Sequence, residues 1–306
     1  MSGRAARGDA SQLAVPLKRP DRTIASQVRL FVRYYPVGVA ALGVLVALVI
    51  ASALAPTIAR FDPLEIDFTA IRGAPSGAHW FGTDDLGRDV FTRVLYGGRV
   101  TLVVAVFSVL IGDGLGFIVG IISAYAGGWY DLVIQRVLEV LLAFPALILA
   151  LLLLVAIGGG VSTIIIAIAV TRIPDSGRVA RSTVLSIKQE PYVEAARSIG
   201  ATGLRVTSRH VAPQTLGLFL VIISINFGFA VFAEAALSFL GVGVPPPTAT
   251  WGGMLGSIVS HIFNPAWWLV VFPGLAIVIT VLAMNLLGDA IRDFADPRSA
   301  ERRTVT

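Results

Sequence analysis

The chain has 306 residues, of which 56% are hydrophobic and only 14% are charged. A soluble domain usually carries about a quarter charged residues, so this composition indicates a protein that lies in lipid. The sequence contains no cysteine, which excludes disulfides, thiol nucleophiles and cysteine-bound metals. The net charge is +5, and the basic residues cluster between apolar segments. In a membrane protein such clusters mark the cytoplasmic side and do not indicate nucleic-acid binding.

The first 35 residues are polar and basic, and an apolar run follows them. We expect residues 1–35 to form a cytoplasmic tail. A cleavable signal peptide is the alternative, since Ala53-Leu54-Ala55 has the small-x-small form of a cleavage site. The uncharged run from Tyr34 to Ala59 is longer than the ~7–15 residues of a signal-peptide core, which favours a membrane span.

Long apolar segments predict about six transmembrane helices, because a helix needs ~20 apolar residues to cross the bilayer. The triple glycine Gly158–Gly160 is unfavourable inside a helix and divides one long uncharged stretch into two. The predicted class is an all-α polytopic membrane helix bundle, with residues 36–290 as its membrane domain and 291–306 as a cytoplasmic C-terminal tail. The six predicted spans are Pro36–Ala59, Val100–Tyr125, Leu132–Ile157, Val161–Asp175, Leu216–Phe239 and Trp267–Leu287.

The distribution of positive charge predicts how these spans are oriented. Outer loops are expected at 60–99 and 241–266, and a cytoplasmic segment at 176–213. With the N-terminus inside, only five of the 24 Lys and Arg residues fall outside, and all five lie in one long loop with at least as many acids. Cytoplasmic loops are the ones enriched in Lys and Arg. We therefore expect both termini to be cytoplasmic, which requires an even number of spans.

A short amphipathic helix is predicted within the cytoplasmic segment. Pro191 suits the start of a helix and Gly200 its end. Glu194 and Arg197 flank an apolar stripe at helical spacing. A helix that packs on its own bundle and a helix that contacts a partner are both compatible with this pattern. The stripe comprises Tyr192, Ala195, Ala196 and Ile199.

The same helix carries a motif. Glu194-Ala195-Ala196, followed by Gly200 and later by Val211 and Pro213, resembles the EAA motif of ABC importer permeases. In that family the segment is a coupling helix that docks into a groove of a cytoplasmic ATPase. The resemblance implies this role for the helix and its end, namely for Tyr192, Glu194, Ala195, Ala196, Ile199 and Gly200.

Two departures from the motif concern only the packing after Gly200. The gap that follows Gly200 is one residue longer than the common pattern, and Ala212 stands where Leu usually precedes the final proline. A second tripeptide, Glu234-Ala235-Ala236, is expected at the outer end of a span, where it cannot meet a cytoplasmic ATPase.

Further motifs narrow the family because they occur in a fixed order. Together they resemble the dipeptide/oligopeptide/nickel permease family, in its second-permease type, over roughly residues 34–298. The resemblance implies the type I ABC importer permease fold, in a bacterial plasma (inner) membrane. The motifs are His79–Asp89, Ala233–Gly243, Trp251-Gly252, Pro273-Gly274, Asn285–Asp289, Arg292-Asp293 and Asp296–Arg298.

The resemblance also implies partners and a solute. A homologous second permease, two cytoplasmic ATPase subunits and an extracytoplasmic solute-binding protein would complete the importer, and the binding protein would dock near His79–Asp89. The solute would be a peptide or a related small molecule.

Gly82–Asp89 taken alone suggests a calcium loop, but it lacks the ligand order of an EF-hand, so a structural turn is expected.

The sequence has no nucleotide-binding motif of its own. A P-loop needs Gly-Lys-Ser/Thr, whereas the two lysines, Lys18 and Lys188, follow Leu17 and Ile187. We therefore expect no catalytic site, no cofactor and no metal on this chain, with ATP and Mg²⁺ used by the partner subunits. A stand-alone channel or secondary transporter, and a membrane scaffold that binds an ATPase without moving solute, are the alternatives.

Polar residues within the predicted spans are candidates for the solute pathway, because a carboxylate at the bilayer centre costs ~2.5–3.5 kcal/mol. Asp113 lies mid-span, and Asn226 lies within the fifth span. For both, a structural hydrogen bond to a neighbouring helix is the alternative. Glu234 is a weaker candidate, because we expect it near the hydrated outer end. Arg136 and Glu139 have the spacing of a structural helical pair.

Overall fold

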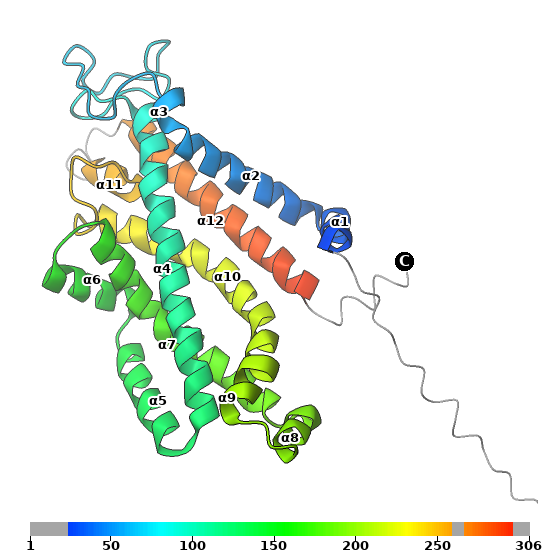
Figure 1. Cartoon of the computed structure of the whole chain (residues 1–306). Helices are drawn as coiled ribbons and strands as arrows, with labels where there is room; N and C mark the ends of the chain where they lie inside the picture. Colours follow the sequence, from blue (N-terminus) through cyan, green and yellow to red (C-terminus); the bar gives the residue numbers. More distant parts are fainter. Residues whose placement is uncertain (1–23, 259–265, 296–306) are drawn as a thin grey trace, which may run out of the picture. The chain divides into compact units, whose positions relative to one another are not determined.

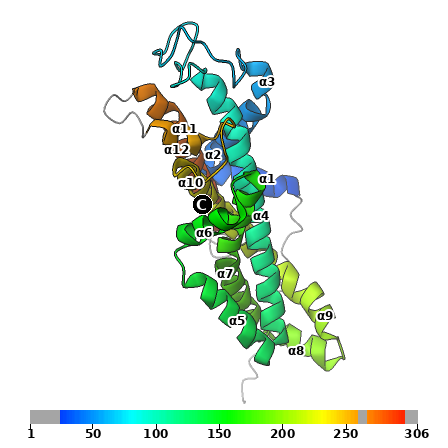
Figure 2. The same ribbon diagram turned by 90° about the vertical axis from the view of Figure 1, so that its left-hand side faces the viewer.

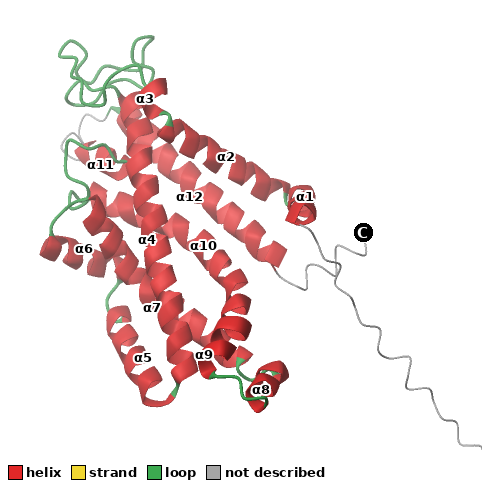
Figure 3. Ribbon diagram, viewed as in Figure 1, coloured by secondary structure: helices red, strands yellow, loops and turns green. Residues whose placement is uncertain are grey.

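The structure is a computed structural model that describes residues 24–258 and 266–295. Within these residues it consists of helices joined by loops, with one isolated β-bridge between Thr83 and Asp89 (Figure 3). The chain divides into two compact units, residues 1–36 and residues 37–306. The predicted all-α class is confirmed.

The first unit contains one described helix, α1 (Ile24–Tyr34). The predicted tail 1–35 therefore ends in a helix, and its first 23 residues lie outside the described part of the chain. The membrane helix α2 (Pro36–Ala53) follows after a single residue, and the short α3 (Ala55–Ile58) comes next. The first predicted span, Pro36–Ala59, thus corresponds to α2 and α3.

The second span is longer than predicted. Helix α4 (Val90–Ala126) begins ten residues before the expected Val100, because the Asp89 side chain accepts a hydrogen bond from the Thr92 N–H and caps the helix. The predicted outer loop 60–99 therefore ends at Asp89. At ~1.5 Å per residue, α4 is about 55 Å long, so it extends well beyond the bilayer core.

The third predicted span is two helices and not one. Helices α5 (Gly128–Leu142) and α6 (Ala146–Ile157) meet at an angle of 88°. Pro145 explains the break, since proline lacks a backbone N–H and disfavours helical conformation in the residue before it. The expected continuous helix Leu132–Ile157 is therefore wrong, whereas the break at Gly158–Gly160 is confirmed.

Helix α7 (Val161–Ile187) continues twelve residues past the expected end at Asp175. The predicted cytoplasmic segment 176–213 thus begins inside a helix. Figures 1 and 2 show α7 alongside α4. At Gly112, Gly116 and Gly120 of α4, an added Cβ would collide with the α7 backbone or side chains, so the glycines permit this close approach.

The rest of the chain contains two more long helices. After α8 (Pro191–Ser198) and α9 (Gly203–Val206), a π-helical turn (Thr207–Val211) leads into α10 (Ala212–Phe239). The short α11 (Trp251–Gly256) is an extra element in the predicted loop 241–266. Helix α12 (Trp267–Ala295) ends eight residues after the expected Leu287, so the predicted tail 291–306 begins inside it.

The number of spans differs from the sequence estimate of six. Among the described residues, four helices have the length and composition to cross a membrane, and the bent pair α5 and α6 could supply a fifth. The four are α2, α4, α10 with its π-helical turn, and α12. Helix α7 corresponds to the remaining expected span, but charged residues occupy its second half.

The two largest of five apolar clusters in the described part of the second unit contain most of its buried core. The larger lies among α4, α6, α7 and α10 and contains fully buried side chains such as Val104, Ile164 and Leu237. The second and smaller of the two joins the C-terminal ends of α4 and α7 to α8, α9 and the π-helical turn. Figures 1 and 2 show that α8 and the loop 59–89 lie at opposite ends of α4.

Candidate functional site

The predicted short amphipathic helix is present and begins and ends as expected. Helix α8 begins at Pro191 and its last turn is followed by Gly200. Gly200 has a φ of +84°, a backbone conformation that glycine adopts without strain. The Gly200 N–H donates to the Arg197 carbonyl at 2.9 Å. The glycine is therefore required by the turn and not by crowding, since an added Cβ would meet no atom within 4 Å.

The apolar stripe of α8 is divided between two faces. Val193 is fully buried and Ala196 is 9% exposed, and both pack in the smaller apolar cluster. Tyr192, Ala195 and Ile199 are exposed, Ile199 by 86%. The prediction of a single stripe is wrong for Ala196, which faces the protein's own bundle.

One face of the helix thus packs on the protein's own bundle, and the other face is open. Sequence reasoning missed Val193 as an anchoring residue. Its spacing of three from Ala196 was the available signal.

Tyr125, at the end of α4, connects α8 to the membrane helices. The Arg197 guanidinium lies 5.7 Å and the Lys188 ammonium 5.3 Å from the centre of its ring, within the range of cation–π attraction. Lys188 also donates to the Ala124 carbonyl at 2.8 Å, where it complements the negative end of the helix dipole. Burial and the nearby Arg197 lower the pKa of Lys188 below its usual value. Neither Tyr125 nor Lys188 was predicted as part of the site.

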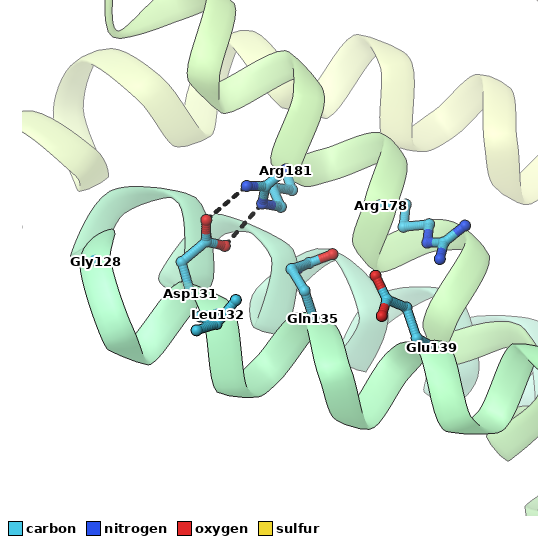
Figure 4. Close-up of a pocket in the computed structure, with 7 residues that line it drawn as sticks. All are labelled: Gly128, Asp131, Leu132, Gln135, Glu139, Arg178 and Arg181. Carbon is cyan, nitrogen blue, oxygen red and sulfur yellow. Dashed lines mark hydrogen bonds and ion pairs between the residues drawn. The ribbon is translucent and has the colours of Figure 1, made fainter.

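A charged pocket of about 510 Å³ lies between α5 and α7 (Figure 4). Arg181 donates two hydrogen bonds to Asp131, at 2.7 and 2.6 Å. The Ser123 hydroxyl donates to the same carboxylate at 2.5 Å. These contacts join α4, α5 and α7 near Tyr125, at the C-terminal end of α4.

The predicted pair of Arg136 and Glu139 is present at 2.7 Å, on the exposed surface.

A buried polar cluster brings together two predicted pathway residues. Asp113 of α4 is fully buried, and its carboxylate accepts a hydrogen bond from the Asn226 amide of α10 at 2.9 Å. The Ser176 hydroxyl of α7 donates to the same carboxylate oxygen, and Arg172 Nε lies 3.7 Å away. The cluster therefore links three helices through one charged group. Arg172 and Ser176, spaced one turn apart on α7, were not predicted.

Next to this cluster, a cavity of about 190 Å³ opens between α7 and α10. Arg172, Asp175, Ser176 and Asn226 contribute its polar lining. The Asp175 side chain is 53% exposed and accepts a hydrogen bond from Arg172 Nη1 at 3.3 Å. Of these four residues only Asp175 is exposed, whereas Arg172, Ser176 and Asn226 are buried.

Glu234 lies in a different environment from the one expected. Its side chain is fully buried, and its carboxylate accepts a hydrogen bond from the Ser238 hydroxyl at 2.7 Å. The Thr101 and Thr250 side chains also interact with it. The expectation of a hydrated position failed because α11 covers this part of α10, and that short helix was not predicted. Glu234 lies eight residues from Asn226 on α10, which corresponds to about 12 Å.

A network of hydrogen bonds and ion pairs holds the loop 59–89 together. Asp84 accepts hydrogen bonds from the Leu86 and Arg88 backbone N–H groups and from the Arg88 side chain. His79 Nδ1 lies 3.0 Å from Asp89 and its Nε2 lies 3.7 Å from Asp67. Hydrogen bonds from Thr69 lower the pKa of Asp67 below its usual value. The expectation of a structural turn agrees with this geometry.

Comparison with known proteins decides the family. Residues 116–301, more than half of the chain, match the family described as binding-protein-dependent transport system inner membrane component. The chain belongs to this family. The matched region contains Ser176 and Asn226 of the polar cluster, the whole of α8, and Glu234.

Curated relatives match almost the full length of this importer permease. The glutathione transport system permease protein GsiD of Escherichia coli O6:K15:H31 (strain 536 / UPEC) is 40% identical over 302 residues, which cover 95% of this chain and 97% of the relative. The proteins of the same name from Shigella boydii serotype 4 (strain Sb227) and Escherichia coli O157:H7 are each 41% identical over 295 residues, covering 93% of this chain and 95% of the relative.

The family and these relatives confirm several predictions. The chain is a multi-pass inner-membrane permease subunit of an ABC importer, with the type I permease fold. It is a transport component and not the ATPase. Importers of this family work with an ATPase and a binding protein in general.

Proposed function

We propose that this permease imports a short peptide of the glutathione kind, in a complex with a homologous second permease, two cytoplasmic ATPase subunits and an extracytoplasmic solute-binding protein. The near full-length similarity to permeases named for glutathione transport supports the solute class. ATP and Mg²⁺ are bound by the ATPase subunits in this proposal, because this chain has no P-loop sequence. It assigns this chain no cofactor.

Both termini lie in the cytoplasm in this proposal. The excess of Lys and Arg in the N-terminal segment, around α8 and after α12 supports that orientation. It places α8 on the cytoplasmic side and the loop 59–89 outside, because these two segments lie at opposite ends of α4 (Figure 1). The solute-binding protein would then meet the ordered loop 59–89.

The observation that carries the proposal is the open face of α8. Ile199 is 86% exposed in a segment whose other face is fully packed. An exposed apolar patch on an otherwise polar surface indicates a contact with another protein. We assign Tyr192, Glu194, Ala195 and Ile199 to the ATPase contact, Ala196 to the attachment of α8 to the bundle, and Gly200 to the turn that ends the helix.

Movement of α8 would reach the membrane helices through Tyr125. Arg197 of α8 and Lys188 both lie against the Tyr125 ring. Asp113 is twelve residues before Tyr125 on the same helix, or about 18 Å away. When the ATPases close on ATP, α8 would shift with them and displace the end of α4. ATP binding would then change the populations of an inward-open and an outward-open state.

The proposed solute pathway runs along the face formed by α7 and α10. Charged groups there, namely the exposed Asp175 and its partner Arg172, would be costly against lipid. This face therefore suits contact with water or with the second permease. Asp113 and Asn226 would hold Arg172 and Ser176 in position along it. Glu234 has no exposed surface, so we assign it to the packing of α10 on α4 and α11.

The proposal is tested by purifying the tagged chain from its native membrane and measuring uptake by the same strain. We expect a second permease and two ATPase chains to copurify, and Glu194→Arg to abolish uptake while the bundle keeps its thermal stability. Glu194→Gln, which keeps the size and removes the charge, is the matched control and should lose less activity. Recovery of the chain alone, with full uptake by Glu194→Arg, would overturn the coupling role.

A further inference from the structure

Helix α1 has two unlike faces. Val28, Phe31 and Val32 lie at helical spacing and share one side of the helix, and Tyr35 follows directly after its end. Arg29 and Arg33 are four residues apart and lie on the other side. Val28 and Val32 are 56% and 51% exposed, so these two apolar side chains are open. The helix contains no acidic residue, and none occurs between Asp21 and Asp62.

The covalent chain limits how far the end of α1 can lie from the start of α2. Helix α1 ends at Tyr34 and the membrane helix α2 begins at Pro36, so Tyr35 is the single residue between them. Pro36 has no backbone N–H and therefore interrupts the hydrogen bonding that would continue α1 into α2. One residue spans less than ~4 Å. The end of α1 is consequently held at the level where α2 enters the lipid.

We infer that α1 is an interfacial helix that lies along the membrane surface and binds anionic lipid headgroups. Its apolar side would rest at the boundary of the acyl chains, while Arg29 and Arg33 would face the headgroup phosphates. This arrangement is typical of amphipathic helices with a basic polar side. Aromatic rings are favoured at the same level of the bilayer, and Phe31 stacks on Tyr35 with ring centres 5.5 Å apart.

Lipid fits this face better than protein for two reasons. The charge of α1 is entirely positive, which matches the anionic surface of a bacterial inner leaflet. Its attachment to α2 also holds the end of α1 at the bilayer surface. The contact would fix the start of α2, while the basic residues would favour its cytoplasmic orientation.

The absence of native cysteine permits a direct test on the full chain. Single variants Val28→Cys, Val32→Cys, Arg29→Cys and Arg33→Cys would each carry one spin label, in nanodiscs of phosphatidylcholine with phosphatidylglycerol. Collision rates with oxygen, which concentrates in lipid, and with a nickel chelate, which stays in water, report the surroundings of each label. Val46→Cys in α2, whose native side chain is 47% exposed, marks a position within the bilayer.

We expect the ratio of oxygen to nickel collisions to be severalfold higher at positions 28 and 32 than at positions 29 and 33. Removing phosphatidylglycerol should reduce the difference. Adding Arg29→Gln and Arg33→Gln to the Val28→Cys chain should remove this lipid dependence, while Lys at both positions should keep it. Equal nickel access at all four positions would show a helix in water, and protection of positions 28 and 32 from both reagents would show a protein contact. Either result would overturn the inference.

Discussion

The Asn226 amide donates a hydrogen bond of 2.9 Å to the Asp113 carboxylate across 113 residues of sequence. This contact ties α10 to α4 beside the face that we propose for solute passage. Because Asp113 is fully buried, the donors around it determine how well the charge is tolerated.

Replacement of Asn226 tests the structural value of this contact. Asn226→Leu should lower the free energy of unfolding by about 1–3 kcal/mol, since it removes a donor from a buried carboxylate. The measurement is thermal unfolding of the purified chain in mild detergent. Ile225→Leu, at the neighbouring and partly exposed position, should change stability much less. Equal stability of the two variants would mean that Asp113 does not depend on Asn226.

The close packing of α4 on α7 can be tested with a matched pair of glycine substitutions. A Cβ at Gly116 would lie 2.6 Å from the Ile173 carbonyl oxygen, whereas a Cβ at Gly114 would meet nothing within 4 Å. Gly116→Ala should therefore destabilise the protein by about 1–3 kcal/mol through overpacking. Gly114→Ala should be neutral or slightly stabilising, because alanine favours the helix. The opposite order in thermal unfolding would contradict the close packing of these helices.

Tyr125 should matter for coupling more than for folding. Tyr125→Ala removes the ring that Arg197 and Lys188 contact, so we expect ATP hydrolysis by the assembled complex to continue while solute uptake falls severalfold. Tyr125→Phe keeps an aromatic ring and should retain most uptake. The comparison uses hydrolysis and uptake measured on the same reconstituted complex. Parallel loss of both activities would argue against a relay through Tyr125.

The ion pair of Asp131 and Arg181 joins α5 to α7 (Figure 4). Arg181→Gln should cost about 1 kcal/mol, because the Arg181 side chain is 32% exposed and solvent weakens the attraction. Arg181→Lys should recover part of this loss, as lysine keeps the charge but not the two-point geometry. Denaturant or thermal unfolding provides the measurement. A larger loss with Lys than with Gln would exclude electrostatic attraction as the cause.

The sequence was most informative where local rules decide the structure. Pro191 and Gly200 predicted the ends of α8, because both act through their own backbone geometry. The triple glycine at 158–160 predicted a helix boundary for the same reason. Composition and the ordered motifs were enough to predict the class and the family.

Errors arose where an apolar run does not determine the shape of the backbone. The run from Leu132 to Ile157 was expected to form one helix, and Pro145 was not recognised as a break. Charged residues were expected to end the fourth span near Asp175, yet α7 continues because α4 supplies glycines and a carboxylate partner along its length.

The polar cluster depended on contacts that spacing cannot predict. Asp113 and Asn226 were each recognised as unusual within a span, but their pairing and the participation of Ser176 depend on how three helices pack. Likewise, the division of the α8 stripe into two faces became visible only once Val193 and Ala196 were placed against α7, α9 and the π-helical turn.

The central claim, that the open face of α8 contacts an ATPase, is tested most directly by photo-crosslinking in the intact membrane. A photoreactive phenylalanine analogue would replace Ile199, with Phe68, which is 79% exposed in the loop 59–89, as the control position. We predict that the Ile199 position crosslinks to a nucleotide-binding ATPase subunit and that the Phe68 position does not. Crosslinks from position 199 only to lipid or to this chain itself, in membranes that retain uptake activity, would contradict the account.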